Sequence, residues 1–254
     1  MSEPESPSPL VRKLRISLRL TRSEIRAIER VQGRRRTFAA DADLITAGKR
    51  SRSVRVIESG WACRHKLFSD GRRQIINFVL PGDIVGLNEY LVGASEYSVT
   101  TLTSVRAAMI APRSLIDVFR AHPRLAMALA WSVARYESLL AEQIVRLGRR
   151  NAYEGIAHIL LELHKRLQAV GLAGESSYQT PITQEMLADA MGLSIVHVNR
   201  TLGRLKRQGL VAISDGRVVL GDAAALAAIA DFETDYLLQR QLPPQPRTEI
   251  LSTP

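Results

Sequence analysis

The chain has 254 residues, of which 46% are hydrophobic, so it can bury the core of one large domain or two smaller ones. Its formal net charge of +10 suits a polyanionic partner such as nucleic acid or an anionic membrane, although a solubilising surface charge is the alternative. No segment approaches the roughly 18 apolar residues that span a bilayer, and the start MSEPESPSPL lacks the features of a secretory signal. We therefore expect a cytoplasmic protein without a membrane partner.

The single cysteine, Cys63, excludes an intrachain disulfide and cannot alone hold an iron–sulfur cluster or a structural zinc ion. We predict no metal site, and a buried strand cysteine rather than a reactive thiol.

The N-terminal region has two parts. Residues 1–9 are rich in Ser, Pro and Glu and predict a disordered tail. Residues 10–36 carry ten Arg and Lys residues among Leu and Ile at helical spacing, which favours one or two short amphipathic helices. These cations form either a solvated helix face or a second nucleic-acid contact. We place a basic or disordered N-terminal segment at residues 1–19.

Between residues 37 and 112 the pattern changes to short β-branched stretches such as RQIINFVL and SVRAAMI. They are separated by the turn signals SDG, LPGD and VGAS, which predicts a small β-sandwich or barrel. We place this sensor domain at residues 20–122.

Residues 123–150 predict one long helix with an apolar stripe at steps of three and four residues. A homodimer seam explains such a stripe, and packing on its own domain is the alternative. The stripe consists of Leu125, Leu129, Val133, Tyr136, Leu140, Ile144 and Leu147.

The segment TQEMLADAMGLSIVHVNRTLGRLKRQ, residues 183–208, predicts a helix-turn-helix. Thr183 and Ser194 cap the two helices, and Gly192 permits the turn between them. The following LVAISDGRVVL predicts a β-hairpin, the wing of a winged helix. We place this DNA-binding domain at residues 151–228 and a C-terminal helix and tail at residues 229–254.

The second helix offers side chains suited to reading DNA. Arg200 can donate two hydrogen bonds to guanine, Asn199 can pair with adenine, and Val196 can contact a thymine methyl. Arg204, with Lys206 and Arg207, is placed to meet phosphates. The predicted DNA-binding residues are Thr183, Gln184, Ser194, Val196, His197, Asn199, Arg200 and Arg204.

This order of elements resembles the Crp/Fnr superfamily of bacterial transcription regulators over roughly residues 20–225. The resemblance is carried by GWACRHKLFSDGRRQIINFVLPGDIVGL, NAYEGIAHILLELHKRL and the helix-turn-helix segment. It implies an α+β fold with an N-terminal β-roll like a cyclic-nucleotide-binding domain, a long dimerisation helix and a C-terminal winged helix-turn-helix. It also implies a homodimer on palindromic double-stranded DNA, with RNA polymerase as a candidate partner.

The chain departs from the cyclic-AMP-binding members at the ligand site. Their charged anchors are replaced here by Gly86, Leu87, Asn88, Tyr97 and Ser98, and Leu140 with Ala141 replaces a polar pair on the dimer helix. A cyclic phosphate in a roll without an arginine would be a poorly compensated charge, so we expect neither cyclic AMP nor an iron–sulfur cluster. The predicted effector pocket comprises Gly86, Leu87, Asn88, Tyr97, Ser98, Tyr136 and Leu140.

We therefore predict a sequence-specific DNA-binding transcription regulator whose roll senses an effector or a stress signal. The alternatives are a ligand-independent regulator controlled by its abundance and a cyclic-nucleotide-responsive regulatory subunit. We expect no enzyme, because we find no nucleophile with its base, phosphate-cradling loop or metal cluster.

Overall fold

The computed structural model describes residues 7–51 and 53–238. The N-terminal half comprises α1 (Pro9–Leu14), α2 (Arg22–Val31), β1 (Arg35–Phe38), β2 (Asp43–Ile45), β3 (Val54–Ser59), β4 (Ala62–Leu67), β5 (Arg73–Val79), β6 (Ile84–Val85), α3 (Leu87–Leu91), β7 (Ser98–Thr101), β8 (Val105–Ile110) and α4 (Pro112–Ala121). The long helix α5 (Pro123–Gly148) follows. The C-terminal half comprises α6 (Ala152–Gln168), β9 (Ser177–Gln179), α7 (Gln184–Met191), α8 (Ile195–Arg207), β10 (Val211–Ser214), β11 (Arg217–Leu220), α9 (Ala223–Ala230) and α10 (Asp235–Leu238).

The predicted β-rich domain is confirmed as a roll of two antiparallel sheets. Their strand orders are β1-β8-β3-β6 and β2-β7-β4-β5. The turn glycines Gly60, Gly71 and Gly82 all have φ near +90°, which side chains with a Cβ rarely adopt. Apolar side chains from both sheets, among them Phe38, Ile57 and Val99, fill the space between them.

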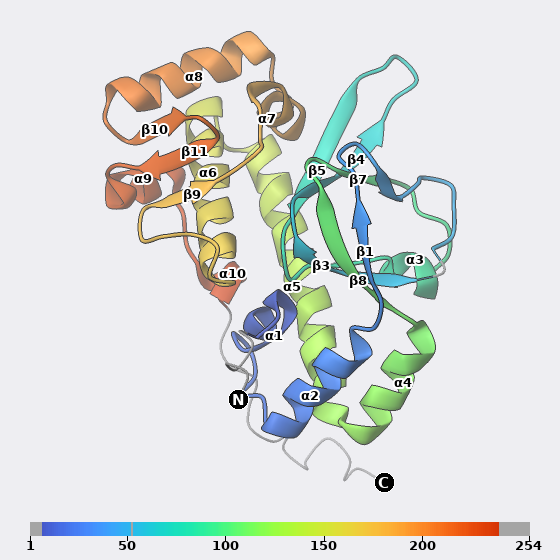
Figure 1. Ribbon diagram of the computed structural model, residues 1–254. Coiled ribbons are helices and arrows are strands. Elements are labelled where there is room, and N and C mark those ends of the chain that lie inside the picture. Colours follow the sequence, from blue (N-terminus) through green and yellow to red (C-terminus); the bar gives the residue numbers. More distant parts are fainter. Residues whose placement is uncertain (1–6, 52, 239–254) are drawn as a thin grey trace, which may run out of the picture.

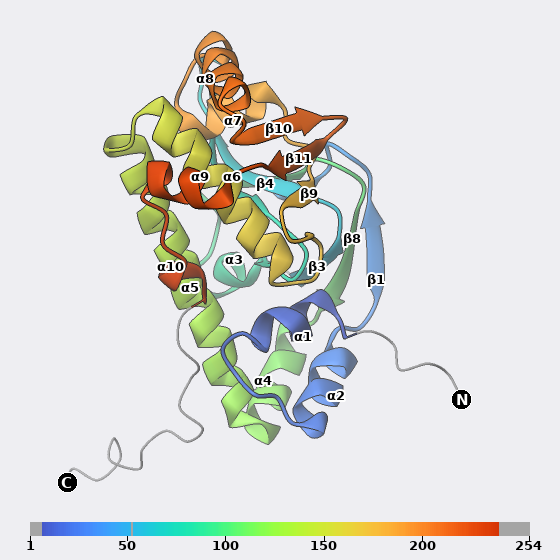
Figure 2. The same cartoon turned by 90° about the vertical axis from the view of Figure 1, so that its left-hand side faces the viewer.

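The helix α5 links the two halves of the molecule (Figures 1 and 2). It runs along one side of the roll and ends at Gly148, and Asn151 caps α6 with a capping box to Glu154. The chain thus has a break between two helices at residues 148–151. Within the described residues, no helix is long and apolar enough to cross a membrane.

The N-terminal segment corrects one prediction. Residues 1–6 lie outside the described residues, but Pro9 already begins α1, and Leu10, Val11, Leu14 and Leu18 are buried. They pack in one cluster with Ile28, Val54 and Leu125. Residues 7–19 are therefore a packed part of the sensor half, because α1 presents an apolar side that the charge pattern obscured.

The same cluster corrects the predicted stripe at one end. Leu125 is buried against the α1 and α2 helices and does not lie on the open face of α5. Val133, Ile144 and Leu147 are exposed, and Leu129, Tyr136 and Leu140 are half-buried. The remainder of the stripe is thus incompletely covered in the single chain.

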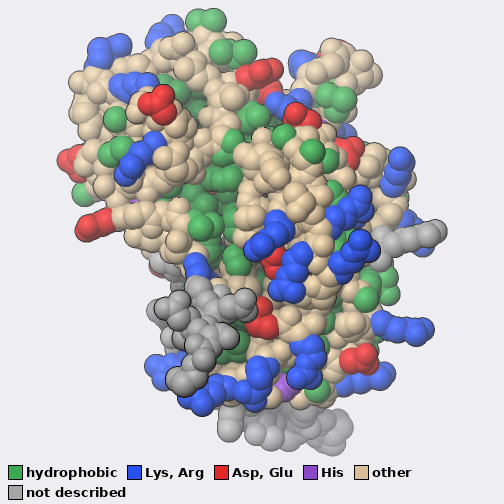
Figure 3. Space-filling view, viewed as in Figure 1, with side chains coloured by type: hydrophobic (Ala, Val, Ile, Leu, Met, Phe, Trp, Pro, Cys, Tyr) green, Lys and Arg blue, Asp and Glu red, His purple; other side chains and the backbone are tan. Residues whose placement is uncertain are grey.

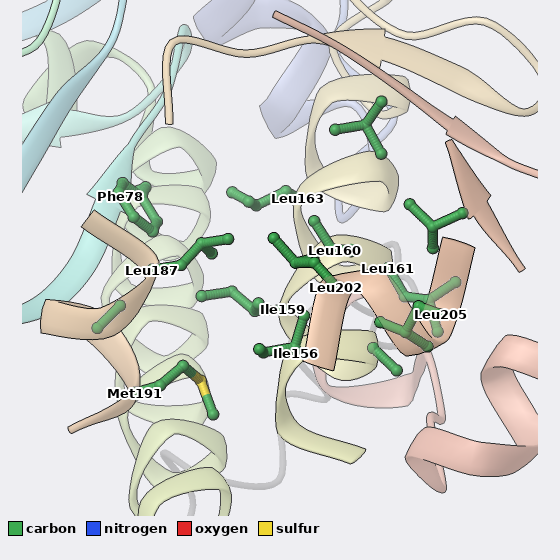
Figure 4. Close-up of a cluster of buried hydrophobic side chains, with 14 of the residues drawn as sticks. Phe78, Ile156, Ile159, Leu160, Leu161, Leu163, Leu187, Met191, Leu202 and Leu205 are labelled. Carbon is green, nitrogen blue, oxygen red and sulfur yellow. The ribbon is translucent and has the colours of Figure 1, made fainter. Parts of the chain in front are cut away.

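The C-terminal half shares a core with the roll. Figure 4 shows Phe78 of the roll facing Leu187 of α7, with α6 leucines and isoleucines beyond them. Helix α9 follows the wing and packs on α6. It begins at Ala223, before the range 229–254 in which we placed a C-terminal helix, and only the short helix α10 lies inside that range. The tail that we predicted at the C-terminal end of this range falls on residues 239–254, which lie outside the described residues.

Candidate nucleic-acid interface

Helices α7 and α8 form the predicted helix-turn-helix. Thr183 Oγ1 accepts a hydrogen bond from the Met186 amide at 3.2 Å, and Ser194 Oγ accepts one from the His197 amide at 3.2 Å. Gly192 ends α7 in the left-handed conformation with φ 63°. The two predicted caps and the turn glycine are therefore confirmed.

The inner faces of the two helices are apolar. Leu187, Ala188 and Met191 of α7 are buried against α6, together with Val198, Leu202 and Leu205 of α8. Figure 4 shows Leu187, Met191, Leu202 and Leu205 in this cluster. The polar Thr201 is also buried, and its hydroxyl donates to the His197 carbonyl at 2.8 Å. This bond satisfies the hydroxyl where an aliphatic side chain would otherwise be expected.

The outer face of α8 is open to solvent at the end of the molecule (Figure 1). Val196 is 77% exposed, Asn199 and Arg200 are exposed, and His197 is half-buried. Among the described residues, Arg200 has no hydrogen-bond or ion-pair partner. A guanidinium and an amide, the groups that can read guanine and adenine in a major groove, are therefore exposed on the outer side of α8.

Two neighbouring cations are held by protein contacts. The Arg204 guanidinium lies 4.3 Å from the centre of the Tyr153 ring, whose hydroxyl donates to Gln208 Oε1. Lys206 Nζ donates to the Ile213 carbonyl in the wing at 3.2 Å. Sequence reasoning missed Tyr153, because nothing local to α6 indicates that its ring lies under α8.

The predicted wing is present. Strands β10 and β11 are joined by Asp215 and Gly216 with φ of 47° and 70°, as a two-residue type I′ turn requires. Strand β9 adds a third strand beside β11.

In Figure 3, Lys and Arg side chains lie over the α8 end of the molecule, and others gather at the opposite end near α2 and α4. Helices α1 and α2, which carry many of the cations of residues 10–36, lie at the end of the molecule opposite α8 (Figure 1), which favours the solvated-face interpretation.

Contacts from the roll and α5 fix the position of α7. Arg73 Nε lies 2.7 Å from Asp189 Oδ2. The Ala190 carbonyl accepts hydrogen bonds from Gln143 Nε2 at 2.7 Å and from Gln74 Nε2 at 3.3 Å. The orientation of the helix-turn-helix is therefore linked directly to strand β5 and to the long helix α5.

A buried polar cluster lies behind this interface. Glu162 of α6 binds Arg146 of α5 and accepts a hydrogen bond from the Tyr236 hydroxyl at 3.2 Å. Burial opposes ionisation of Glu162, but Arg146 and Arg166 outweigh burial and lower its pKa. Burial and the Arg146 guanidinium lower the pKa of His158 to about 3, so this imidazole is neutral at pH 7. The cluster holds the end of α5 against the DNA-binding domain.

A cavity of about 350 Å³ lies between the roll and α5, where the effector pocket was predicted. Gly86, Leu87, Asn88, Tyr97, Tyr136 and Leu140 line it. Ser98 does not line it, because its hydroxyl instead accepts a hydrogen bond from the Ala47 amide at 3.1 Å.

The charge of the cavity corrects a second expectation. We argued that the roll offers no arginine to a charged ligand, but Arg64 of β4 and Arg135 of α5 both line the cavity. Neither position could be recognised from the sequence, because both side chains line the cavity only once the roll and α5 pack against each other. Cys63, next to Arg64, is fully buried, and burial raises the pKa of its thiol to about 11, as an inert strand cysteine requires.

A roll joined by a long helix to a winged helix-turn-helix, with an open polar and cationic reading helix, defines a sequence-specific DNA-binding transcription regulator. Residues 35–122 match the cyclic nucleotide-binding domain family, and residues 155–229 match the Crp-like helix-turn-helix domain family. The nitrogen fixation regulation protein FixK of Bradyrhizobium diazoefficiens is 32% identical over 211 residues, which are 83% of this chain and 87% of that protein. The chain therefore belongs to the Crp/Fnr family of transcription regulators.

Two further relatives agree with this assignment. The transcriptional activator protein FnrL of Cereibacter sphaeroides is 27% identical over 229 residues, covering 89% of this chain and 91% of FnrL. The solved structure of FixK2 from Bradyrhizobium japonicum has a TM-score of 0.69 and 25% identity, covering 77% of this chain and 96% of that one.

Proposed function

We propose that this regulator acts as a homodimer on a palindromic operator in the cytoplasm, with one α8 helix in the major groove of each half-site. The observation that carries the proposal is the free face of α8, where Arg200, Asn199 and Val196 are exposed together. Thr183, Gln184 and Ser194, also exposed at the starts of the two helices, are assigned to backbone contacts. Arg204, positioned by Tyr153, serves the same purpose.

The dimer half of the proposal rests on α5. Its 26 residues extend about 39 Å at 1.5 Å per residue, and its uncovered side carries Val133, Ile144 and Leu147. Apolar side chains along a helix of this length are stabilised by a second copy of the same helix. A two-fold dimer then presents two α8 helices to a palindrome.

The roll is proposed to sense an effector through the cavity beside α5. We retain the expectation that cyclic AMP is not this effector, because the cavity has Leu140 and Tyr97 where the family's cyclic-AMP binders have polar and charged anchors. RNA polymerase is the further partner that this role implies. A regulator without any effector is the second candidate, but the buried charged side chains that line the cavity favour a bound effector.

The experiment that tests the proposed assembly is sedimentation of the full chain with labelled duplex carrying its operator. Two chains per duplex are expected, at concentrations where the free protein is also dimeric. One chain per duplex would contradict the proposal.

A further inference from the structure

The cavity between the roll and α5 contains more positive than negative charge. Its lining includes the cations Lys13, Arg64, Arg135 and Arg166, against the carboxylates of Asp83 and Glu89. Asp83 already binds Lys13 and Arg166, the latter at 2.9 Å. Among the described residues, neither Arg64 nor Arg135 forms an ion pair with a carboxylate, so no direct contact neutralises either guanidinium group.

Arg135 is the least satisfied of these groups. Its side chain comes from α5 and is only 4% exposed, yet its Nε and Nη1 atoms are buried without a hydrogen-bond partner in the described part of the chain. Burial and the nearby Arg166 guanidinium lower the pKa of Arg135 to about 10. A buried cation of this kind destabilises the empty protein and favours an incoming anion.

Arg64 reaches the cavity from the opposite wall. Its guanidinium lies 4.8 Å from the Tyr97 ring centre and 4.4 Å from that of Tyr136, and it donates to Asn77 Oδ1 at 3.3 Å. Its Nε atom has no partner within the described residues. A cation flanked by two aromatic rings is held in place without being neutralised.

The rest of the lining sets the shape of a ligand. Leu80, Leu87, Leu129 and Leu139 provide apolar surface from both walls. Glu89 is 3% exposed, and its Oε1 atom lacks a hydrogen-bond partner among the described residues. The volume of about 350 Å³ lies near the lower end of small-molecule sites, roughly 300–1,000 Å³.

We infer that this cavity binds a small amphipathic organic anion, whose acidic group contacts Arg135 and Arg64, whose apolar body lies among the leucines, and whose hydrogen-bond donor reaches Glu89. The inference rests on the proposed sensing role of the roll and names the chemical class of the effector. Because Arg64 belongs to β4 and Arg135 to α5, one bound anion joins the roll to the dimerisation helix. Binding is thereby coupled to the helix that carries the DNA-binding domain.

The test uses the fluorescent sulfonate 8-anilinonaphthalene-1-sulfonate, which has an anionic group, an apolar body and an N–H donor. Its neutral analogue N-phenyl-1-naphthylamine has the same body without the charge. Both are titrated into the full chain and into three variants: Arg135→Met, Leu87→Trp and the exposed control Arg113→Met. No DNA is present, so a failure of operator recognition leaves this experiment unaffected.

We expect one sulfonate per chain in the wild type and in Arg113→Met. Arg135→Met should weaken sulfonate binding roughly ten-fold or more while leaving the neutral analogue unchanged, because only the charge-assisted contacts are lost. Leu87→Trp should block both probes by filling the cavity. Arg135→Met should also melt at the same temperature as the wild type or higher, because an unpaired buried cation is removed.

Equal sulfonate affinity in the wild type and Arg135→Met, or no saturable binding in the wild type, would overturn the inference. So would a lower melting temperature for Arg135→Met, since that would make the guanidinium a structural group.

Discussion

Arg73 of β5 and Asp189 of α7 form an ion pair, with Nε 2.7 Å from Oδ2, that joins the sensor roll to the helix-turn-helix. Both side chains are partly exposed, at 30% and 22%. The pair lies beside the hydrogen bond from Gln74 to the Ala190 carbonyl. A change in the position of β5 is therefore transmitted to α7 without passing through the hinge at residues 148–151.

Replacing either partner should weaken this link. We expect Arg73→Ala and Asp189→Ala each to lower the free energy of unfolding by about 0.5–1 kcal/mol, and the double variant to lose about as much as one single variant. Urea unfolding of the double-mutant cycle measures the coupling. The control is Arg72→Ala, whose partner Asp70 lies on the exposed hairpin turn. Fully additive losses would show that the two residues do not interact.

The buried carboxylate of Glu162 should contribute much more to stability. Its removal leaves the Arg146 and Arg166 guanidinium groups buried without their shared partner. We expect Glu162→Gln to lower the free energy of unfolding by about 3–5 kcal/mol, the range for breaking a buried ion pair. Urea unfolding at pH 7 measures it, with the exposed Glu175→Gln as the matched control. A loss no larger than that of the control would contradict the structure.

The same cluster predicts a pH dependence. The folded chain holds His158 neutral, with its Nδ1 3.0 Å from Arg146 Nη2, and its pKa is lowered to about 3 by burial and by Arg146. The unfolded histidine has a pKa of about 6.5, so between these values the unfolded state binds the extra proton and stability falls as the pH falls.

Asp83 makes stability depend on pH in a more acidic range. Burial opposes ionisation of Asp83, but Lys13 and Arg166 hold its pKa at about 2. Its contribution to the free energy of unfolding is therefore lost only below about pH 4. We therefore expect the free energy of unfolding of the wild type to fall by about 2 kcal/mol from pH 7 to pH 5 because of His158. Urea denaturation of His158→Gln at pH 7 and pH 5 should not show this fall in the free energy of unfolding. A fall as large as that of the wild type would contradict a neutral His158.

The exposed end of the α5 stripe should hold the dimer together. Ile144 is 70% exposed in the single chain, so Ile144→Glu should place an unpaired carboxylate in the seam. Sedimentation at micromolar concentration should show a dimer for the wild type and a monomer for the variant. Val92→Glu, at a site 80% exposed and outside α5, should remain dimeric. A dimeric Ile144→Glu protein would place the interface elsewhere.

Elements with local signals were predicted well from the sequence. The helix-turn-helix follows from Thr183, Ser194 and Gly192, because caps and left-handed turns depend on a few neighbouring residues. The wing follows from Asp215 and Gly216 for the same reason.

Features that depend on distant packing were missed. The burial of Leu125 depends on α1 and α2, more than 90 residues earlier, and the position of Arg135 in the cavity depends on its contact with the roll. Ser98 was assigned to the pocket by analogy with the family, whereas its hydroxyl is used within the roll. Helical periodicity locates a face, but it does not tell which neighbour that face meets.

Selection of binding sites from a random duplex library, at low and high salt, tests most directly whether α8 reads DNA as proposed. The wild type should enrich a palindrome that persists at high salt, and Arg200→Ala should lose it, since one bidentate base contact contributes about 1–3 kcal/mol of discrimination. Arg207→Ala should keep the palindrome and show a weaker salt dependence of binding. The same palindrome enriched by Arg200→Ala, or salt-sensitive binding without any motif in the wild type, would contradict the assignment of α8 as the reading helix.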